Sequence, residues 1–178
     1  MSHHDGLAAR RLADVGQWPL DEFAGLLGDV FERSPWVARH AWHRRPFADV
    51  DELHLHMMAA VHAADAAQQR ELLCAHPELA GREAQAGQLT EASDHEQTGA
   101  GLHSLHADEL ASMTRLNAAY RARHGFPFIV CVRHYTKAGI LFELARRTAL
   151  DTEREKSEAL NQVAAITRIR LAALFPLD

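Results

Sequence analysis

Four side chains that could transfer a proton or bind a polar ligand lie between positions 72 and 102. They are the imidazole of His76, the hydroxyl of Ser93, the carboxylate of Glu96 and the amide of Gln97. An imidazole suits proton transfer near neutral pH, and a fixed carboxylate can bind a hydroxyl group or tune that imidazole. This segment is therefore the first candidate for an active site.

The sequence predicts that His76 lies at the end of a helix. Asp65 is a suitable N-cap for a helix that carries Leu72 and Leu73 on its apolar face. Pro77 disfavours helical geometry at the residue before it, so this helix should end at or just before His76. The backbone would then restrain the histidine while its side chain stays accessible.

The other three polar side chains are expected to share one face of a second helix. Thr90 is a suitable N-cap for a helix that runs toward Gly99. Ser93 lies three residues before Glu96 and four before Gln97, and these spacings place side chains on the same face. Taken singly, each also has an ordinary explanation as a cap or a solvated helical residue, just as His76 could be purely structural.

Two further parts of the chain could contribute to a site. Residues 126–132, FPFIVCV, could be a buried strand, a buried extended loop or a helix start. Backbone interrupted by proline inside a core would offer N–H and C=O groups to a small polar heterocycle, whereas the simpler alternative is a plain core segment. Arg168 and Arg170 both have apolar neighbours at helical spacing, and periodicity does not decide which one turns inward.

The 13 histidines do not predict a metal site. The zinc-binding patterns H-E-x-x-H and H-x-E…P-C-x-x-C are both missing from the sequence. The nearest approach to a ligand cluster is Cys74, His76 and Glu78, where the intervening proline makes joint coordination awkward. Cys74 and Cys131 are expected to be small buried residues without a disulfide, as in a reducing compartment.

Composition indicates an ordinary globular protein. The 178 residues suit one domain, predicted over 1–178 with an N-terminal lead at 1–20, and 47% of them are hydrophobic. A formal charge of −5 gives no reason to expect nucleic acid or an anionic membrane as a partner. Since no apolar run could span a bilayer and no signal-peptide pattern is present, a cytoplasmic location is expected.

Helix start signals recur along the chain, and no second strand pattern accompanies residues 126–132. Gly125 is expected to end a helix that begins near Leu110. The predicted fold class is all-α, a single compact domain of about eight helices, and the short helices argue against a simple up-down bundle. The expected helix starts are Asp21, Ser34-Pro35, Asp51, Asp65, Thr90, Thr136 and a capping box formed by Thr152 and Glu155.

Several motifs together resemble the 2-oxo-4-hydroxy-4-carboxy-5-ureidoimidazoline (OHCU) decarboxylase family. HPELAG at 76–81 is followed by LTEASDHEQ at 89–97, HGFPF at 124–128 and RIRL at 168–171. With LGDVFERSPWVARHAW and RPF in residues 27–47, the resemblance covers nearly the whole chain. It implies an all-α, cofactor-independent decarboxylase, commonly a homodimer, that converts OHCU to (S)-allantoin in urate degradation.

The resemblance also implies roles for individual residues. His76 would be the catalytic proton donor, and Glu96 would hold the substrate hydroxyl and help to keep the imidazole charged. His124 and Val132 depart from the residues often found at their positions, which bears on substrate fit more than on the reaction. The implied substrate-binding residues are Pro77, Ser93, Asp94, His95, Gln97, Phe128, Ile129, Val130, Cys131, Val132 and Arg170, with 94–95 and 128–132 acting largely through main-chain groups.

Two other classes of function stay open on the sequence alone. The first is a non-catalytic helical module that binds a ligand in the same pocket, although such a module would not need the complete set of polar side chains. The second is a metal-dependent hydrolase that uses the many histidines. Direct turnover separates the first from an enzyme, and metal analysis of the purified protein separates the second.

Overall fold

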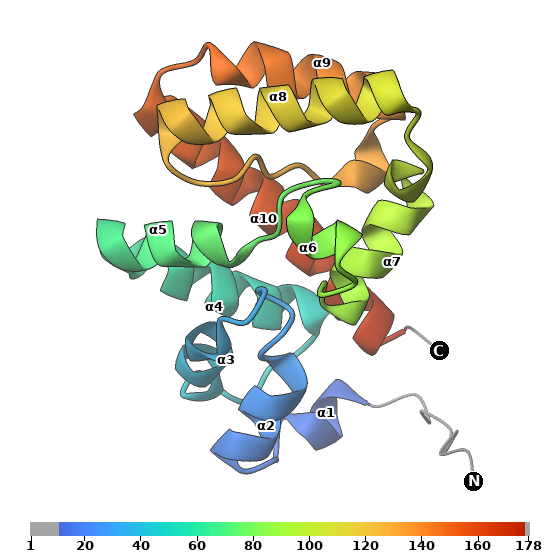
Figure 1. Cartoon of the computed structure of the whole chain (residues 1–178). Coiled ribbons are helices and arrows are strands. Elements are labelled where there is room, and N and C mark those ends of the chain that lie inside the picture. The colour runs from blue at the N-terminus through green and yellow to red at the C-terminus, as the bar shows by residue number, and fades with distance from the viewer. Residues whose placement is uncertain (1–10, 177–178) are drawn as a thin grey trace, which may run out of the picture. The chain divides into compact units, whose positions relative to one another are not determined.

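The structure is a computed structural model that describes residues 11–176, and the regular structure of this part is entirely helical (Figure 1). Eight of its ten α-helices have eight residues or more, so the prediction of an all-α fold with about eight substantial helices is confirmed. The elements are α1 (Leu12–Val15), α2 (Leu20–Leu27), α3 (Pro35–Trp42), α4 (Val50–Ala63), α5 (Ala66–Ala75), α6 (Arg82–Gln85), α7 (Glu91–Gly99), the 3-10 helix η1 (Leu102–Ser104), α8 (Ala107–His124), the 3-10 helix η2 (Val132–His134), α9 (Lys137–Thr148) and α10 (Thr152–Leu174).

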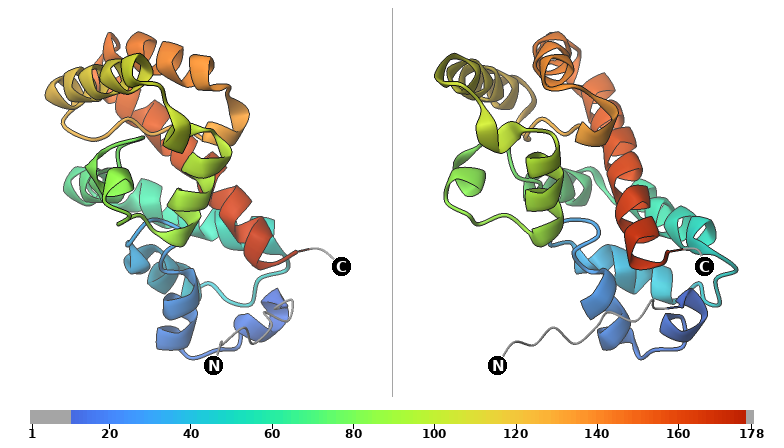
Figure 2. Two further views of the ribbon diagram at one scale, coloured as in Figure 1. Left: turned by 45° about the vertical axis from the view of Figure 1, so that its right-hand side comes forward. Right: turned by 90° about the vertical axis from the view of Figure 1, so that its right-hand side faces the viewer.

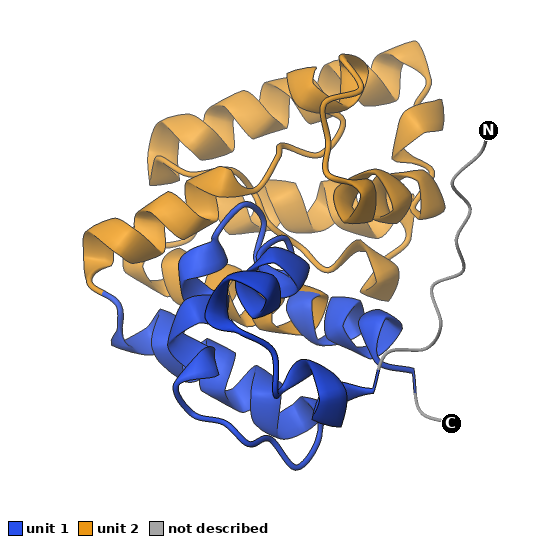
Figure 3. Ribbon diagram, turned by 90° about the horizontal axis from the view of Figure 1, so that it is seen from below, with its two compact units in different colours: residues 1–64, 167–178 blue, residues 65–166 orange. Residues whose placement is uncertain are grey.

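The chain divides into two compact units, residues 1–64 with 167–178 and residues 65–166 (Figure 3). Within the first unit, α3 packs against both α2 and α4, around the fully buried side chains of Phe23, Val37 and Met57. Residues 1–10 of the predicted lead lie outside the described residues, and α1 forms in its second half. A single domain over 1–178 stays a prediction.

In the second unit, α8 and α9 lie side by side, as two views show (Figure 2). Apolar side chains recur along the facing stripes of these helices, and Met113 of α8 and Ile140 and Leu144 of α9 are fully buried. Such stripes form because burial of apolar surface is the main driving force of folding. Tyr120 of α8 lies in the same core, and its hydroxyl is bound there by a polar network described below.

Predicted helix caps agree with the structure at three positions, whereas the starts expected at Asp21 and Asp51 are wrong. α2 begins at Leu20 with Pro19 at its N-cap, so Asp21 lies within the helix. Asp65, Thr90 and Thr136 each accept a hydrogen bond from a backbone N–H of the first turn, as predicted. The start expected at Asp51 is wrong by two residues, because the side chain of Asp49 accepts from the N–H of Glu52 and takes the N-cap position of α4.

The carboxylate of Glu109 links the starts of α8 and α9. It accepts hydrogen bonds from the Lys137 ammonium at 2.9 Å and from the backbone N–H of His106 at 2.9 Å. These contacts, chiefly the one from Lys137, hold the pKa of Glu109 below its usual value. A carboxyl with a lowered pKa in the folded state stabilises the fold at neutral pH, and this contribution is lost as the pH falls.

We expect Glu109→Gln to lower the melting temperature at pH 7 and to have little effect in acid. The stabilisation is present above the unfolded pKa of about 4.3 and disappears as the pH falls through the lower folded pKa. Calorimetric scans between pH 7 and pH 3 measure the difference. Glu71→Gln is the control, since Glu71 is exposed and forms no ion pair within residues 11–176. Equal shifts for the two variants at every pH would contradict this role of Glu109.

Candidate active site

His76 lies directly after α5, where its sequence context predicts it. The helix ends at Ala75, and the backbone of His76 is extended (φ −73°, ψ 135°), as a following proline favours. Its Nδ1 lies 3.0 Å from the carbonyl oxygen of Leu72, one helical turn back, and the residue is only 6% exposed. Because a carbonyl only accepts hydrogen bonds, Nδ1 carries a hydrogen and Nε2 is the nitrogen that can release or take up a proton.

The turn that follows Pro77 is bound to two helices. The N–H of Ala80 donates to Oε1 of Gln97 on α7 at 2.8 Å, and the carbonyl of Leu79 accepts from Nδ2 of Asn117 on α8 at 3.0 Å. Ala80 has a φ of 51°, which residues with a side chain seldom adopt, so the turn depends on such contacts. The backbone next to the candidate histidine is thus coupled to α7.

α7 directs the predicted serine and glutamine into the protein interior. Ser93 and Gln97 are buried, and Glu96 beside them is half-buried. The oxygen of the Gln97 amide must face the N–H of Ala80, because a backbone N–H can only donate. Its Nε2 makes no hydrogen bond within residues 11–176 and can therefore donate to a ligand.

Asp94 and His95 lie on the exposed side of α7. The Asp94 carboxylate pairs with Nε2 of His103 at 3.3 Å, and its backbone N–H already donates to the carbonyl of Thr90 at 2.9 Å. The helix therefore uses the main-chain donor that the resemblance offered to a substrate at this position. A role for these two residues stays a prediction.

A cavity of about 420 Å³ lies against α7 and η2, which are in contact with each other. It brings together the predicted site residues Glu96 and Val132, with His95 beside them, and it adds Arg133 and Tyr135, which the sequence did not single out. A carboxylate, a guanidinium and a phenol around one cavity suit a small polar molecule. Its lining residues are His95, Glu96, Gly99, Ala100, Val132, Arg133 and Tyr135.

The apolar run 126–132 is a buried loop up to Cys131, where the backbone is extended, and η2 begins at Val132. The five predicted substrate-binding residues 128–132 are all buried. The carbonyl of Ile129 accepts from Nη1 of Arg147 at 2.9 Å, and the N–H of Cys131 donates to Oε1 of Gln162 at 2.9 Å. The three possibilities left open by periodicity are thus resolved in favour of the extended loop.

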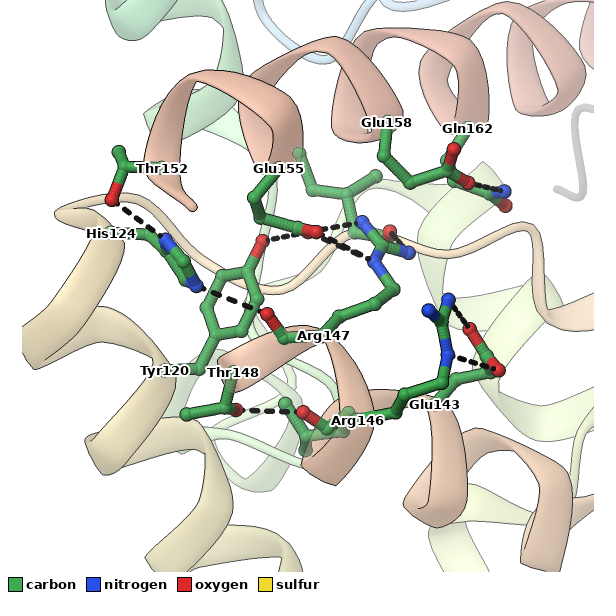
Figure 4. A network of polar contacts seen from close by, with 12 residues as sticks. Tyr120, His124, Glu143, Arg146, Arg147, Thr148, Thr152, Glu155, Glu158 and Gln162 are labelled. Carbon is green, nitrogen blue, oxygen red and sulfur yellow. Dashed lines mark hydrogen bonds and ion pairs between the residues drawn. The ribbon is translucent and has the colours of Figure 1, made fainter. Parts of the chain in front are cut away.

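Arg147 belongs to a buried polar network between α8, α9 and α10 (Figure 4). Its guanidinium donates to Glu155, and Glu155 also accepts from the hydroxyl of Tyr120 at 2.5 Å. Burial raises the pKa of Tyr120 well above its usual value, and the hydrogen bond to Glu155 raises it further. The tyrosine therefore keeps its proton, and the charged pair at the centre of the network is Arg147 with Glu155.

His124 extends this network. Its ring lies 4.6 Å from that of Tyr120, Nδ1 lies 3.1 Å from the Thr152 hydroxyl and Nε2 lies 3.2 Å from the carbonyl of Arg147. Thr152 and Glu155 therefore do not form the predicted capping box, and that prediction is wrong. Asp151 takes the role instead, accepting from the N–H groups of the two residues that follow Thr152.

Arg170 belongs to the other compact unit, the one that holds α1 to α4. Its guanidinium donates to the Glu32 carboxylate at 2.9 Å and to the carbonyl of Val30 at 3.3 Å, and the residue is buried. Arg168 pairs with Asp51 near the surface. The arginine that turns inward is thus Arg170, and its contact with substrate stays a prediction.

Titratable side chains within residues 11–176 form no group of three or more that could hold a metal ion. Neither cysteine forms a disulfide, and Cys131 is buried as predicted. Cys74 is exposed, so the prediction of burial is wrong there. It lies on the face of α5 opposite to the buried Leu72 and Leu73, with its thiol 3.7 Å from the carbonyl of Gly125.

Sequence reasoning missed the residues that support the site: Asn117, Arg147, Glu155 and Gln162. A signal for two of them was present. Arg147 continues the buried stripe of Ile140 and Leu144 at helical spacing, and Glu155 lies four residues before the buried Ala159. A charged residue in an apolar stripe indicates either a buried ion pair or a functional group.

A model of the family described as OHCU decarboxylase matches residues 16–172. Enzymes with the name 2-oxo-4-hydroxy-4-carboxy-5-ureidoimidazoline decarboxylase are similar over most of their length. The enzyme of Mus musculus is 38% identical, and the alignment covers 92% of this chain and 92% of the mouse enzyme. The enzyme of Haloferax volcanii is also 38% identical, and the alignment covers 92% of this chain and 95% of that enzyme.

A solved structure of (S)-allantoin synthase superposes with a TM-score of 0.73 at 31% identity, and this chain covers 54% of that longer chain. A structure of OHCU decarboxylase in the presence of (S)-allantoin has a TM-score of 0.67 and, at 21% identity, shows likeness of fold alone. The family match over most of the chain and relatives of similar length agree with the motifs around His76. The chain belongs to the OHCU decarboxylase family.

Proposed function

We propose that this protein decarboxylates OHCU to (S)-allantoin in urate degradation. The observation that carries the proposal is the geometry of His76, a buried histidine whose Nδ1 is bound to the carbonyl of Leu72. One ring nitrogen is thereby fixed, and we assign proton transfer to the other, since an imidazole titrates near neutral pH. The loop that follows this histidine is bound to Gln97, and the family of the chain catalyses this class of reaction.

The chemistry of the substrate explains why side chains suffice. The carbon that bears the departing carboxylate adjoins a ring C=N, which accepts the electron pair when the C–C bond breaks and carbon dioxide leaves. The ring nitrogen takes up one proton and the enamine carbon, which was the carbon of the former C=N, takes up another, while the substrate hydroxyl loses its proton and becomes the carbonyl of allantoin. The enzyme must supply orientation, stabilisation of the developing charge and delivery of the proton to one face. We propose that Nε2 of His76 delivers this proton and that the Glu96 carboxylate binds the substrate hydroxyl.

The remaining assignments concern binding. The Ser93 hydroxyl and Nε2 of Gln97 lie on the buried face of α7, where they suit the polar edge of a heterocycle. The main chain of residues 128–132 would bind the substrate from the loop, beside Pro77. We propose that Arg170 binds the carboxylate or ureido end of the substrate.

Turnover of freshly generated OHCU, followed by circular dichroism, tests the proposal. The wild-type protein should speed decarboxylation and give (S)-allantoin, whereas the spontaneous reaction has no chiral influence and gives a racemic product. Binding without turnover would favour the ligand-binding module. Stoichiometric zinc in the purified protein, with activity lost in a chelator, would favour the hydrolase.

We expect Glu96→Gln to lower kcat/KM for OHCU by about 10- to 100-fold while the protein stays folded. Glutamine has nearly the same shape, but it replaces a charged acceptor by a neutral one, and hydrogen bonds to charged groups contribute about 1.5–3 kcal/mol. Steady-state kinetics measure the loss. Glu91→Gln on the exposed side of the same helix is the control and should leave kcat/KM unchanged. Wild-type kinetics in the first variant would remove Glu96 from the site.

Two finer assignments rest on the resemblance. We propose that the enzyme is a homodimer, and the exposed Phe142 ring on α9 is an apolar surface that a second copy could cover. We also propose a cytoplasmic location, which suits a protein whose two cysteines form no disulfide. No helix within residues 11–176 is long and apolar enough to cross a membrane. Sedimentation velocity and cell fractionation test the two assignments.

A further inference from the structure

Two side chains bind the backbone of the loop 128–131 from α9 and α10. Arg147 donates to the carbonyl of Ile129, and Gln162 accepts from the N–H of Cys131. The residue between these two bound positions is Val130, and its polar groups bond to neither Arg147 nor Gln162.

Val130 is 3% exposed, yet its N–H and C=O make no hydrogen bond within residues 11–176. Buried backbone groups are nearly always paired, since an unpaired one costs about as much free energy as a lost hydrogen bond. The pair of groups on Val130 suits a ligand that presents one donor and one acceptor. A ureido-substituted heterocycle has both.

We propose that Arg147 and Gln162 are positioning residues of this enzyme, which fix the loop so that the main chain of Val130 meets the substrate. The inference rests on the proposed function, because the ligand of the loop is taken to be OHCU. Neither side chain needs to touch the substrate. Arg147 binds Ile129 and Gln162 binds Cys131, and these two residues flank Val130, whose main chain would bind the substrate.

The network around Arg147 makes it a rigid support. The guanidinium donates to both oxygens of Glu155 and, through a different nitrogen, to the carbonyl of Ile129. It also lies over the ring of Phe128, with its central carbon 4.7 Å from the ring centroid. A planar group with five donors in a fixed arrangement can satisfy these partners together, whereas the single ammonium of lysine cannot.

Gln162 is a second residue that supports the loop, and unlike Arg147 it is neutral and only half-buried. Its Nε2 donates to the Glu158 carboxylate one turn earlier at 2.8 Å (Figure 4). This bond fixes the amide so that Oε1 accepts from the N–H of Cys131. The side chain is only half-buried, so its loss should disturb the core little. This makes it the better residue for separating position from stability.

The consequence for the reaction is a loss of both rate and facial selectivity. Displacement of a binding group by about 1 Å can lower a rate by about 100-fold. A substrate held loosely against Val130 would present both faces of the enamine carbon to His76, or would react without help. The excess of (S)-allantoin should therefore fall together with kcat.

The test uses Arg147→Lys and Gln162→Met, each with a matched partner. Arg147→Lys keeps the charge beside Glu155, and its control is Arg146→Lys, which changes the neighbouring exposed arginine paired with Glu143. Gln162→Met keeps the length of the side chain but removes the acceptor. The exchange variant Gln162→Glu with Glu158→Gln restores an acceptor for Cys131 and keeps a donor beside it, whereas Gln162→Glu alone would bring two carboxylates together. We expect kcat/KM to fall about 10- to 100-fold in Arg147→Lys and in Gln162→Met. Arg146→Lys should match the wild type, and the exchange variant of Gln162 and Glu158 should recover part of the loss.

Measured on folded protein below the melting transition, a loss of kcat with a reduced excess of (S)-allantoin supports positioning. If Arg147→Lys does not fold, Gln162→Met decides alone. Wild-type kcat and wild-type enantiomeric excess in Gln162→Met would overturn the inference, because a purely structural glutamine would change only the melting temperature. Racemic product from the wild-type protein would instead overturn the proposed function itself.

Discussion

Replacement of His76 with asparagine is expected to lower kcat/KM for OHCU by about 100- to 10,000-fold, the range typical of a general acid. The amide of asparagine can still donate to the carbonyl of Leu72, so the end of α5 should keep its geometry. It cannot release a proton at the position of Nε2. The initial rate of (S)-allantoin formation, followed by circular dichroism, measures the effect.

The matched control is His62→Asn, which changes an exposed histidine of α4. It should leave both rate and product unchanged. The asparagine variant at position 76 is also expected to give nearly racemic allantoin, since the spontaneous reaction then contributes most of the product. An unchanged rate and a pure (S) product would show that another group delivers the proton.

Glu155→Leu is expected to reduce the free energy of unfolding by about 3–5 kcal/mol, the typical cost of removing one member of a buried ion pair. Arg147 is 1% exposed, so its charge would lose its partner without gaining water. The hydroxyl of Tyr120 would also lose its acceptor. Urea unfolding at pH 7 measures the change in the midpoint and in the slope.

Two comparisons sharpen that measurement. Glu143→Leu breaks the exposed pair with Arg146 and should cost no more than about 1 kcal/mol. The double variant Arg147→Met with Glu155→Leu removes both buried charges and should recover part of the lost stability. It should not recover activity, because the carbonyl of Ile129 still lacks its donor. Equal costs for Glu155→Leu and Glu143→Leu would contradict the buried-pair interpretation.

Several features set by neighbouring residues were predictable from the sequence, although local signals at Asp21 and Asp51 misplaced two helix starts. Asp65, Thr90 and Thr136 cap helices as predicted, because a cap bonds to an N–H only two or three residues away. The position of His76 at a helix end follows equally from the proline after it. Gly125 ends α8 with a φ of 78°, which glycine adopts without strain.

Features set by distant partners were not predictable. Thr152 and Glu155 match the capping-box pattern, yet Glu155 bonds with Arg147 and Tyr120, which lie far from it in sequence. No local pattern distinguishes a glutamate that caps from one that enters the core. The same limit applied to Arg168 and Arg170, where the choice depends on Glu32.

The candidate site shows both situations in one place. The motif residues were visible because their types suit chemistry, whereas Asn117 and Gln162 resemble ordinary helical polar residues. Their function appears only once the turn at Leu79 and the loop at Cys131 are seen to bind them. Residues that support a site act through contacts with segments distant in sequence, and the spacing of residues along the chain does not predict such contacts.

The bond between Nδ1 of His76 and the last turn of α5 has a consequence for the evolution of the enzyme. Each residue of an α-helix advances the chain by about 100° around the axis. An insertion or deletion of one residue within α5 would therefore turn the imidazole to another side, even though every catalytic group remained. In the proposed reaction, the length of α5 therefore determines which face of the substrate receives the proton. Insertions and deletions should be tolerated less in α5 than in the loops of the protein.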